Sequence, residues 1–407
     1  MARVLKRYGL KPKPGDLKQP CAWDPHQDGR MGRHDDLRRC HFLKPRRSTP
    51  PVIRSHAPAG ADPDALRRNM TDALSYRMAG TDLPDAAKPF AQMTMKEMLR
   101  DCLTRQGIDP RGMSTDELIR TGMHTTSDFP VALQDAVHKV AMAGYQAATS
   151  QIKQLARKRT YKDFRPSHGA WIGDLGNLRE LKEGGEITHT TFTEGGEVSQ
   201  LSTYALAINY SRGLIVNDDL NLFGDTPAAF GRSAAQTEAD LLVETLTGGG
   251  KLADGQGVFH SSRGNTRTGQ LDIATLTATR LSLRTRKGRD GQSYINVTPR
   301  FLVVPPGLET TAEMLLTSIN AATVGDVNPW SGKLKIIVEP RLPETHYYIF
   351  ADPAVAPALQ YGYLAGAEGV QVQRREMWDQ LGISFRAWLD FGCGWVDWRG
   401  VERVEIA

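Results

Sequence analysis

Apolar and polar side chains alternate most regularly near the C-terminal end of the sequence. Ile383, Phe385, Ala387 and Leu389 occupy every second position, and polar or amphipathic residues separate them. Successive side chains of a strand point to opposite faces, so this pattern predicts an antiparallel strand with one face on a core. Further strands are predicted over 204–216, 294–304, 334–338 and 347–350.

Helical spacing of apolar residues predicts most of the other elements. Pro130 is expected to open a helix that runs to about Lys158, because proline is favoured at the first helical position. Ser114 is expected to cap another helix, since its hydroxyl oxygen can accept from free backbone amides. Amphipathic helices are also predicted over 62–79, 93–106, 271–287 and 308–319.

A long helix is predicted over 225–247. Asp225, Thr226 and Pro227 form a typical helix start, with capping oxygens followed by proline at the first helical position. The triple glycine at 248–250 is expected to end this helix. At 1.5 Å per residue the helix would be about 30 Å long.

The segment 165–200 differs from its surroundings because paired glycines punctuate short β-prone pieces. This pattern predicts a long two-stranded arm that stands away from the core. An irregular surface loop is the alternative. The length favours the arm, since structureless loops of this size are uncommon in compact domains.

Composition limits the class of protein. The chain has 407 residues, of which 40% are hydrophobic and 24% are charged. These values support a buried core in two or three domains and exclude wholesale disorder, collagen and coiled coils. No apolar run approaches the ~18 residues of a membrane span, and no secretory signal is readable. The four scattered cysteines indicate a reducing compartment.

Residues 1–57 are basic and rich in proline. They contain 14 Lys or Arg against 5 Asp or Glu, and seven of the 23 prolines. Proline interrupts helices and central strands, so the segment is predicted to be a disordered basic arm. It either contacts nucleic acid phosphates or is a solvated tail, and the tail is the favoured interpretation. Its candidate zinc ligands Cys21, His26, Cys40 and His41 lack the paired spacing of structural zinc sites.

Several short motifs suggest ligand binding or catalysis but lack the residues that the chemistry needs. The glycine run before Lys251 lacks the leading glycine and the following Ser or Thr of a phosphate-binding loop. The Asp-Phe-Gly at 390–392 stands without the other kinase motifs, and no G-x-S-x-G occurs. The acidic residues between 218 and 225 are better explained as helix caps than as cation ligands. We therefore predict no catalytic residue, no cofactor and no metal.

Aromatic and arginine side chains gather near the C-terminus. Trp388 falls on the same predicted strand face as Arg386 and Asp390. Trp and Arg are enriched at the centres of protein interfaces, which makes this face a candidate subunit contact, with core burial as the alternative. The candidate interface residues, including those of the arm, are Glu183, Glu186, Phe192, Arg386, Trp388, Trp395, Trp398 and Arg399.

A series of motifs runs in colinear order through roughly residues 120–407. It includes TSDFP at 126–130, PRFLVVPP at 299–306, VEPRL at 338–342 and DWRG at 397–400. Together these motifs resemble the major capsid proteins of tailed phages. More specifically, they are similar to Mu-type major head subunits and to the capsid half of prohead protease–major capsid fusion proteins.

The resemblance implies an α+β chain with the Hong Kong 97-type phage capsid fold. It also implies a non-enzymatic subunit that assembles into hexamers and pentamers of an icosahedral shell around double-stranded DNA. Portal, scaffold and prohead protease are the implied partners, without a membrane, and the virion capsid would be assembled in the bacterial host cytoplasm.

Two other functions compete with this one: a prohead protease–capsid fusion remnant with proteolytic activity, and a basic-arm nucleic-acid-binding protein.

The resemblance and the composition changes together give expected domain boundaries. The expected parts are a basic arm (1–57), a helical scaffold or delta-like region (58–125), an N-arm helix and E-loop (126–200), a peripheral domain with a spine helix (201–270), an axial domain (271–375) and a strand returning to the peripheral domain (376–407).

Overall fold

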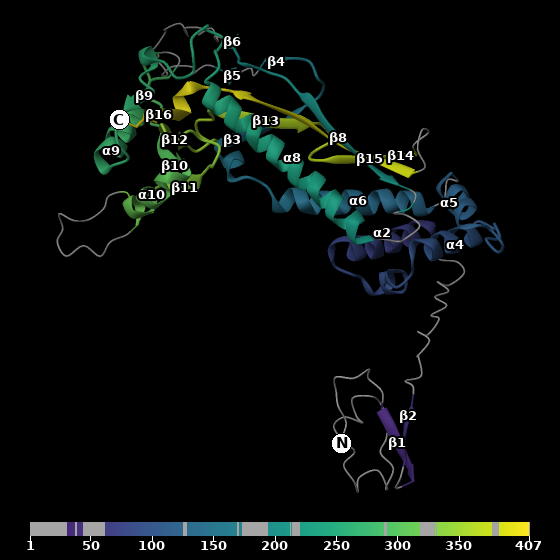
Figure 1. Cartoon of the computed structure of the whole chain (residues 1–407). Helices are drawn as coiled ribbons and strands as arrows, with labels where there is room; N and C mark the ends of the chain where they lie inside the picture. The colour runs from purple at the N-terminus through teal and green to yellow at the C-terminus, as the bar shows by residue number, and fades with distance from the viewer. Residues whose placement is uncertain are drawn as a thin grey trace, which may run out of the picture. The chain divides into compact units, whose positions relative to one another are not determined.

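The structure is a computed structural model in which the chain divides into two compact units, Met1–Ala57 and Pro58–Ala407 (Figure 1). In the first unit it describes one antiparallel pair, β1 (Met31–Asp36) and β2 (Arg39–Leu43). The predicted disorder of the basic arm stays a prediction. The described residues are 31–36, 39–43, 62–124, 128–168, 171–172, 194–211, 213, 220–288, 291–317, 330, 332–376 and 382–406.

The second unit begins with helices that pack against α6 (Asp128–Ala147). Met70 and Leu74 are fully buried on the inner face of this group. A capping box starts α4, because Thr94 Oγ1 accepts from the Glu97 amide and the Glu97 carboxylate accepts from the Thr94 amide. The helices are α2 (Pro63–Ala79), α3 (Lys88–Ala91), α4 (Met95–Arg105) and α5 (Thr115–His124), with the 3-10 turn η1 (Asp85–Ala87).

The helix predicted from Pro130 to about Lys158 is shorter than expected. α6 ends at Ala147, and after a 3-10 turn, η2 (Gln151–Leu155), the chain enters β3 (Ala156–Tyr161). β3 pairs in parallel with β13 (Leu359–Leu364), which is distant in sequence. The prediction was wrong at this end because tertiary strand pairing overrode local helical spacing.

The first sheet is built around β15 (Gly382–Trp395). The predicted alternation is confirmed, since Ile383, Phe385, Ala387 and Leu389 are buried. One side of β15 pairs with β14 and then β13, and the other side pairs with β8. The strand order is β14 (Gln371–Glu376), β15, β13 and β3, with β8 (Ser202–Ser211) beside β15.

The second sheet lies between helices on both faces. α9 (Ile273–Arg284) and α10 (Glu309–Leu316) cover one face, where Leu276 and Ala312 pack into the same cluster as Leu302. The 3-10 turn η4 (Pro306–Leu308) leads into α10. The strand order is β11 (Lys335–Val338), β10 (Pro299–Val304), β12 (His346–Ala351), β16 (Val401–Glu405) and β9 (Thr266–Thr268).

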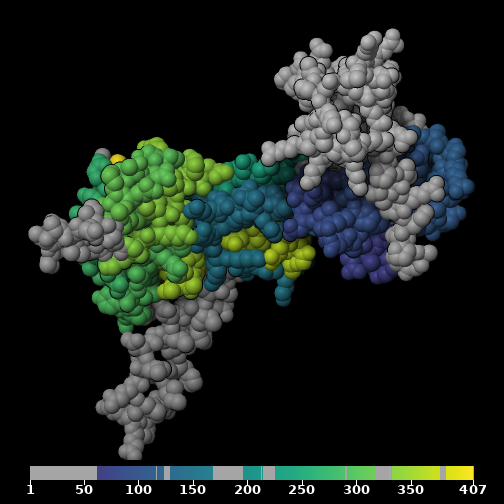
Figure 2. All heavy atoms as spheres, turned by 90° about the horizontal axis from the view of Figure 1, so that it is seen from below, coloured from purple at the N-terminus to yellow at the C-terminus, as the bar shows by residue number. Residues whose placement is uncertain are grey.

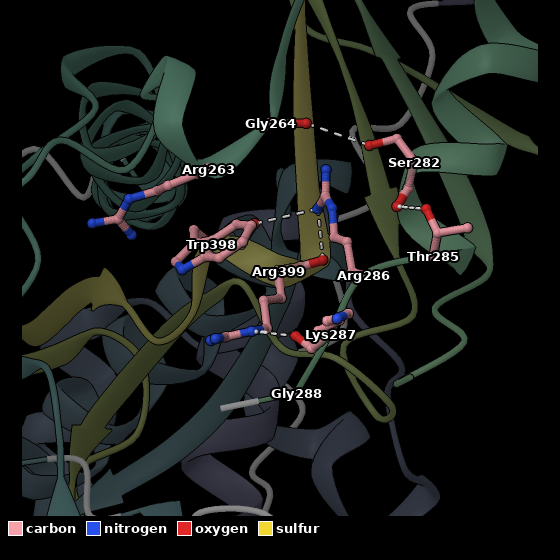
Figure 3. A pocket seen from close by; sticks show the side chains of 9 residues that line it. All are labelled: Arg263, Gly264, Ser282, Thr285, Arg286, Lys287, Gly288, Trp398 and Arg399. Atoms are coloured by element: carbon pink, nitrogen blue, oxygen red, sulfur yellow. Dashed lines mark hydrogen bonds between the residues drawn. The ribbon is translucent and has the colours of Figure 1, made fainter. Parts of the chain in front are cut away.

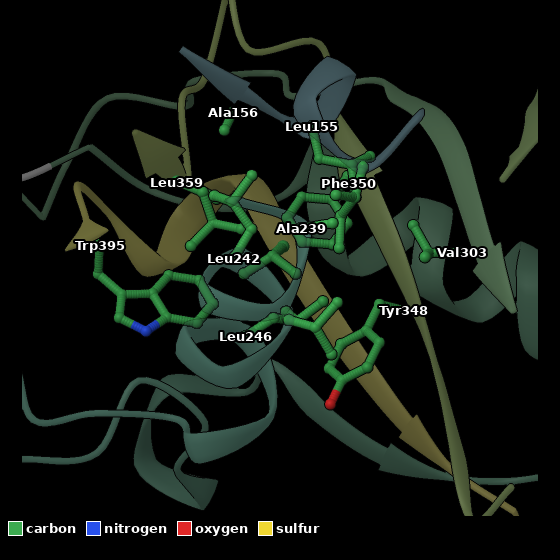
Figure 4. Packing of buried hydrophobic residues seen from close by; sticks show 14 of the residues in the cluster. Leu155, Ala156, Ala239, Leu242, Leu246, Val303, Tyr348, Phe350, Leu359 and Trp395 are labelled. Atoms are coloured by element: carbon green, nitrogen blue, oxygen red, sulfur yellow. The ribbon is translucent and has the colours of Figure 1, made fainter. Parts of the chain in front are cut away.

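The opposite face of the second sheet packs against the C-terminal half of α8 (Leu220–Gly248). Leu242 and Leu246 of the helix lie against Tyr348 and Phe350 of β12 (Figure 4). At its other end α8 packs on α2 and α6 (Figure 1). The helix therefore joins the helical group to both sheets.

The long helix begins earlier than predicted. It starts at Leu220 rather than near Asp225, so Pro227 lies inside it, and its 29 residues span about 43 Å. The helix packs closely on α6, because a Cβ atom at Gly231 would clash with Ala141 O. The predicted end is confirmed, since the helix stops at Gly248 and the next two glycines have positive φ.

The two sheets interleave along the chain. β13 and β14 pair with β3 and β15 in the first sheet, whereas β16 inserts between β12 and β9 in the second. The expected boundaries 271–375 and 376–407 therefore cut across both sheets. Figure 2 shows the residues of α9, α10 and β10–β12, in green, at one end of the second unit, and those of α2–α5, in purple and blue, at the other. The predicted α+β class is confirmed.

Candidate subunit interface

The arm is described at its base, where it is a two-stranded ribbon. Ser167 pairs with Ser199, and Trp171 pairs with Gly195, in one continuous antiparallel register. The predicted two-stranded form is thus confirmed for this part, whereas the candidate residues Glu183, Glu186 and Phe192 lie outside the described residues. The base strands are β4 (Ser167–His168), β5 (Trp171–Ile172), β6 (Glu194–Gly195) and β7 (Val198–Ser199).

The base of the ribbon is fixed to the body of the subunit. Ser199 is buried, and its hydroxyl oxygen accepts from Tyr161 Oη at 2.7 Å and from Gln360 Nε2 at 3.0 Å. The Glu197 carboxylate accepts from the Ala253 amide at 2.9 Å. These contacts come from three separate parts of the chain, so they fix the position from which the ribbon leaves the body.

Arg386 and Trp388 lie together on the solvent face of the first sheet. The Arg386 guanidinium carbon is 5.4 Å from the centre of the Trp388 ring. Its Nε donates to Gln373 Oε1 at 3.0 Å. The paired residues on β8 are Ala205 and Ala207, whose small side chains leave the tryptophan and arginine accessible. A cation–π pair on a partly exposed sheet face is a surface suited to protein contact.

Trp395 has a different position, inside the core of its own subunit. Its side chain is 6% exposed and packs edge-on against Phe259 at 5.6 Å between ring centres. Its Nε1 donates to Thr245 O near the end of α8 at 3.1 Å. This tryptophan therefore anchors the end of β15 on the long helix, and its ring is not on the described surface.

Trp398 and Arg399 line a basic pocket with a volume of about 340 Å³ (Figure 3). They belong to a 3-10 turn, η6 (Trp398–Gly400), between β15 and β16. The Arg263, Arg286 and Arg399 guanidinium carbons lie 5.7, 5.7 and 4.8 Å from the Trp398 ring centre. Hydroxyls and glycines complete the wall, and none of the lining residues is acidic: Arg263, Gly264, Ser282, Thr285, Arg286, Lys287, Gly288, Trp398 and Arg399.

The arginines of this pocket mainly hold the turn in place. Arg286 Nη1 donates to Arg399 O at 2.7 Å and to Val401 O at 2.9 Å, and its Nη2 donates to Glu402 Oε2 at 2.9 Å. Burial lowers the pKa of Arg286 to about 10, and the Glu402 carboxylate partly offsets that effect. Arg263 pairs with Asp254 at 2.7 Å. The Arg286 bonds therefore tie the turn and the start of β16 to the segment after α9, whereas the Arg263–Asp254 pair lies within the segment after α8.

Sequence reasoning missed a buried polar cluster between α6, α8 and β13. Tyr145 Oη lies 2.9 Å from Tyr363 Oη and donates to the fully buried Glu238 carboxylate, which also pairs with Lys153. Burial, reinforced by the charge of Glu238, raises the pKa of both tyrosines well above the ordinary value. A single glutamate inside a helix gives no sequence signal for such a cluster.

Neither a metal centre nor a membrane-spanning helix is found in the described part of the chain. No group of three or more His, Cys, Asp or Glu residues there could hold a metal ion. No described helix is both long and apolar enough to cross a bilayer.

Residues 196–404, more than half of the chain, match the family model of the phage capsid protein. The chain belongs to this family. It is a structural subunit of the virion capsid rather than an enzyme, which confirms the predicted role as a capsid protein. No curated protein matches the sequence.

Solved capsid structures are similar over most of their length. The capsid of the cyanophage P-SCSP1u is 11% identical, with 64% of this chain and 89% of that chain covered and a TM-score of 0.43. The virus-like particle from Pyrococcus furiosus is 12% identical, with 66% and 98% covered and a TM-score of 0.39. The match to Mycobacterium phage Che8 is 15% identical, with 64% and 91% covered and a TM-score of 0.41. These TM-scores are low, so the family model carries the assignment.

Proposed function

We propose that this chain is the major capsid subunit of a tailed phage and assembles into hexamers and pentamers of an icosahedral shell around double-stranded DNA. The observation that carries the proposal is the family match, together with the colinear motifs that resemble major head subunits. A closed shell needs head-to-tail contacts that repeat between copies. A ribbon fixed to its own subunit at the base can supply them while the subunit core stays folded.

The proposal assigns the parts of the Hong Kong 97-type fold to the two sheets. The first sheet with α8 is the peripheral domain, and the second sheet with α9 and α10 is the axial domain. α6 is the N-arm helix, the ribbon at 165–200 is the E-loop, and residues 58–125 are the scaffold or delta-like region. Portal, scaffold and prohead protease are the proposed partners, and packaged DNA lies against the inner surface.

The candidate interface falls into three parts under this proposal. Glu183, Glu186 and Phe192 belong to the ribbon that reaches a neighbouring subunit. Arg386 and Trp388 provide an exposed contact on the first sheet. The third part is the turn with Trp398 and Arg399, which Trp395 supports from within the core.

Shortening the ribbon tests the proposal. A variant that lacks 172–198, with the two ends joined by a short glycine linker, is expected to give folded subunits that form no particles by negative-stain electron microscopy. Particles of normal size from this variant would contradict the assigned role. A matched control replaces residues 318–329 by a similar linker and is expected to leave the subunit fold intact by circular dichroism.

A further inference from the structure

The outer edge of β8 is the longest unprotected strand edge in the described part of the molecule. β8 pairs with β15 over ten consecutive residues without a bulge. No other described strand pairs with its second side (Figure 1). The strand contains no charged residue and no proline, and seven of its ten residues are exposed.

The remaining sheet edges carry the features that prevent strands from pairing with other molecules. β3 has Arg157, Lys158 and Arg159, and β14 ends in Arg374, Arg375 and Glu376. In the second sheet, β11 and β9 are short, at four and three residues, and each carries a basic residue. Short length and charge are the usual protection of an edge strand, so β8 is the exception in this subunit.

The position of β8 connects it with the candidate interface. It begins three residues after β7, the base of the ribbon. It is also paired directly with the stretch of β15 that carries Arg386 and Trp388. Leu206, at the middle of the strand, is 53% exposed and offers an apolar contact beside the edge.

We propose that the outer edge of β8 pairs with an extended strand of a second copy of this chain when the shell assembles. This inference rests on the proposed function and names one surface that performs it. Backbone N–H and C=O groups of the two strands would bond across the boundary, as in other cases of strand addition to a sheet edge. Leu206 and Trp388 lie on opposite faces of this sheet, because Trp388 is paired with Ala205, the neighbour of Leu206 in β8.

A second copy is the occupant that the family assignment favours. A capsid subunit meets many identical copies, and an unprotected edge in a chain that stayed monomeric would promote aggregation. The ten-residue strand carries no cations for nucleic acid phosphates, so packaged DNA is a poor match for this edge. The alternative is that a segment of the same subunit pairs with this edge, and an experiment must distinguish that case from pairing with a second copy.

Hydrogen–deuterium exchange of the full-length chain, compared between free subunits and assembled particles, tests the pairing. The expected result is that amides within 202–211 exchange at least about 10-fold more slowly in particles, while β3 and β14 change little. Unchanged exchange of β8 in well-formed particles would overturn the inference and leave the proposed function standing. Full protection of β8 in free subunits would also overturn it, because the subunit's own chain would then cover the edge. Failure of the wild-type chain to form any particle would overturn both proposals.

A pair of matched variants gives an independent test. Leu206→Lys places a solvated charge at the edge and is expected to lower particle yield about 10-fold or more, with an unchanged circular dichroism spectrum. Val355→Lys makes a similar change at a side chain that is 68% exposed and away from β8, and it is expected to assemble like wild type. Equal particle yields from the two variants would contradict the inference.

Discussion

The Tyr145 hydroxyl on α6 lies within hydrogen-bonding distance of both carboxylate oxygens of Glu238 on α8. The tyrosine Oη lies 2.7 Å from one carboxylate oxygen and 2.9 Å from the other. Lys153 donates to the same tyrosine at 3.0 Å and forms an ion pair with Glu238. The contact therefore fixes the proposed N-arm helix against the long helix through groups that solvent cannot screen.

Removing the buried charge is expected to destabilise the subunit strongly. Glu238→Gln leaves the Lys153 ammonium buried without its carboxylate, and the expected loss is about 3–5 kcal/mol in the free energy of unfolding. Tyr363→Phe removes one hydroxyl from the same cluster and is expected to cost about 1–3 kcal/mol. Urea unfolding of unassembled subunits measures both effects. Tyr76→Phe, at an exposed ring, is the control and should stay within about 0.5 kcal/mol. A similarly small effect of Glu238→Gln would contradict this account.

The contact between α6 and α8 also depends on a glycine. A Cβ atom at Gly231 would lie 2.5 Å from Tyr145 N and closer still to Ala141 O, and backbone atoms cannot move aside easily. Gly231→Ala is expected to destabilise by about 1–3 kcal/mol, although alanine is the better helix former. Gly248→Ala is the matched control, because no atom lies within 4 Å of its added methyl group. Equal thermal midpoints for the two variants would show that the helices are not in this close contact.

Replacing the two tryptophans of β15 by alanine is expected to affect different properties, the stability of the subunit for Trp395 and its assembly for Trp388. Trp395→Ala empties a core site beside α8 and should cost about 3–5 kcal/mol in the unfolding of free subunits. Trp388→Ala removes a partly exposed ring and should leave unfolding within about 1 kcal/mol of wild type. Its effect should appear in assembly, where loss of a central aromatic contact costs about 2 kcal/mol or more. Light scattering of assembling subunits measures the second effect. Normal assembly of Trp388→Ala would remove this residue from the interface.

The position of His346 leads us to expect that the folded subunit loses stability against unfolding as the pH falls. Burial, followed by the nearby charge of Arg403, lowers its pKa, and Glu405 acts in the opposite direction. The unfolded chain therefore binds a proton more readily than the folded subunit. The stability that His346 contributes is complete above its ordinary pKa of about 6.5 and is lost as the pH falls through the lower folded value.

Thermal unfolding of free subunits between pH 7.5 and 4.5 checks this sign. His346→Gln is expected to flatten part of the decline seen in wild type. His260→Gln, at an exposed histidine, is the control and should follow the wild-type curve. A wild-type midpoint that rises as the pH falls through this range, with His346→Gln removing the rise, would contradict the assignment.

Local sequence patterns predicted those helices and strands whose apolar positions coincide with the face that is buried in the folded subunit. The alternation from Ile383 to Leu389 appears as β15 because one face of that strand rests on a core. The helices at 62–79 and 93–106 appear as α2 and α4, close to their expected limits. The triple glycine ends α8 where expected, since positive φ stops helix propagation.

Elements that depend on distant partners were not predictable in the same way. β3 reads as a basic helical segment, and its strand form comes from pairing with β13. The Trp398 pocket brings together residues 113 positions apart, and the Glu238 cluster brings together residues 218 positions apart. Trp388 and Trp395 lie seven positions apart on one strand and so face opposite sides, and the structure shows that Trp395 is the buried one.

If this chain assembles with copies of itself into closed shells, size-exclusion chromatography of the purified full-length protein, with negative-stain electron microscopy of each fraction, will show it. The expected result is hexamers or pentamers that convert into closed particles of uniform diameter. A chain that stays monomeric at high concentration, and that forms no closed particle under any assembly condition, would contradict it.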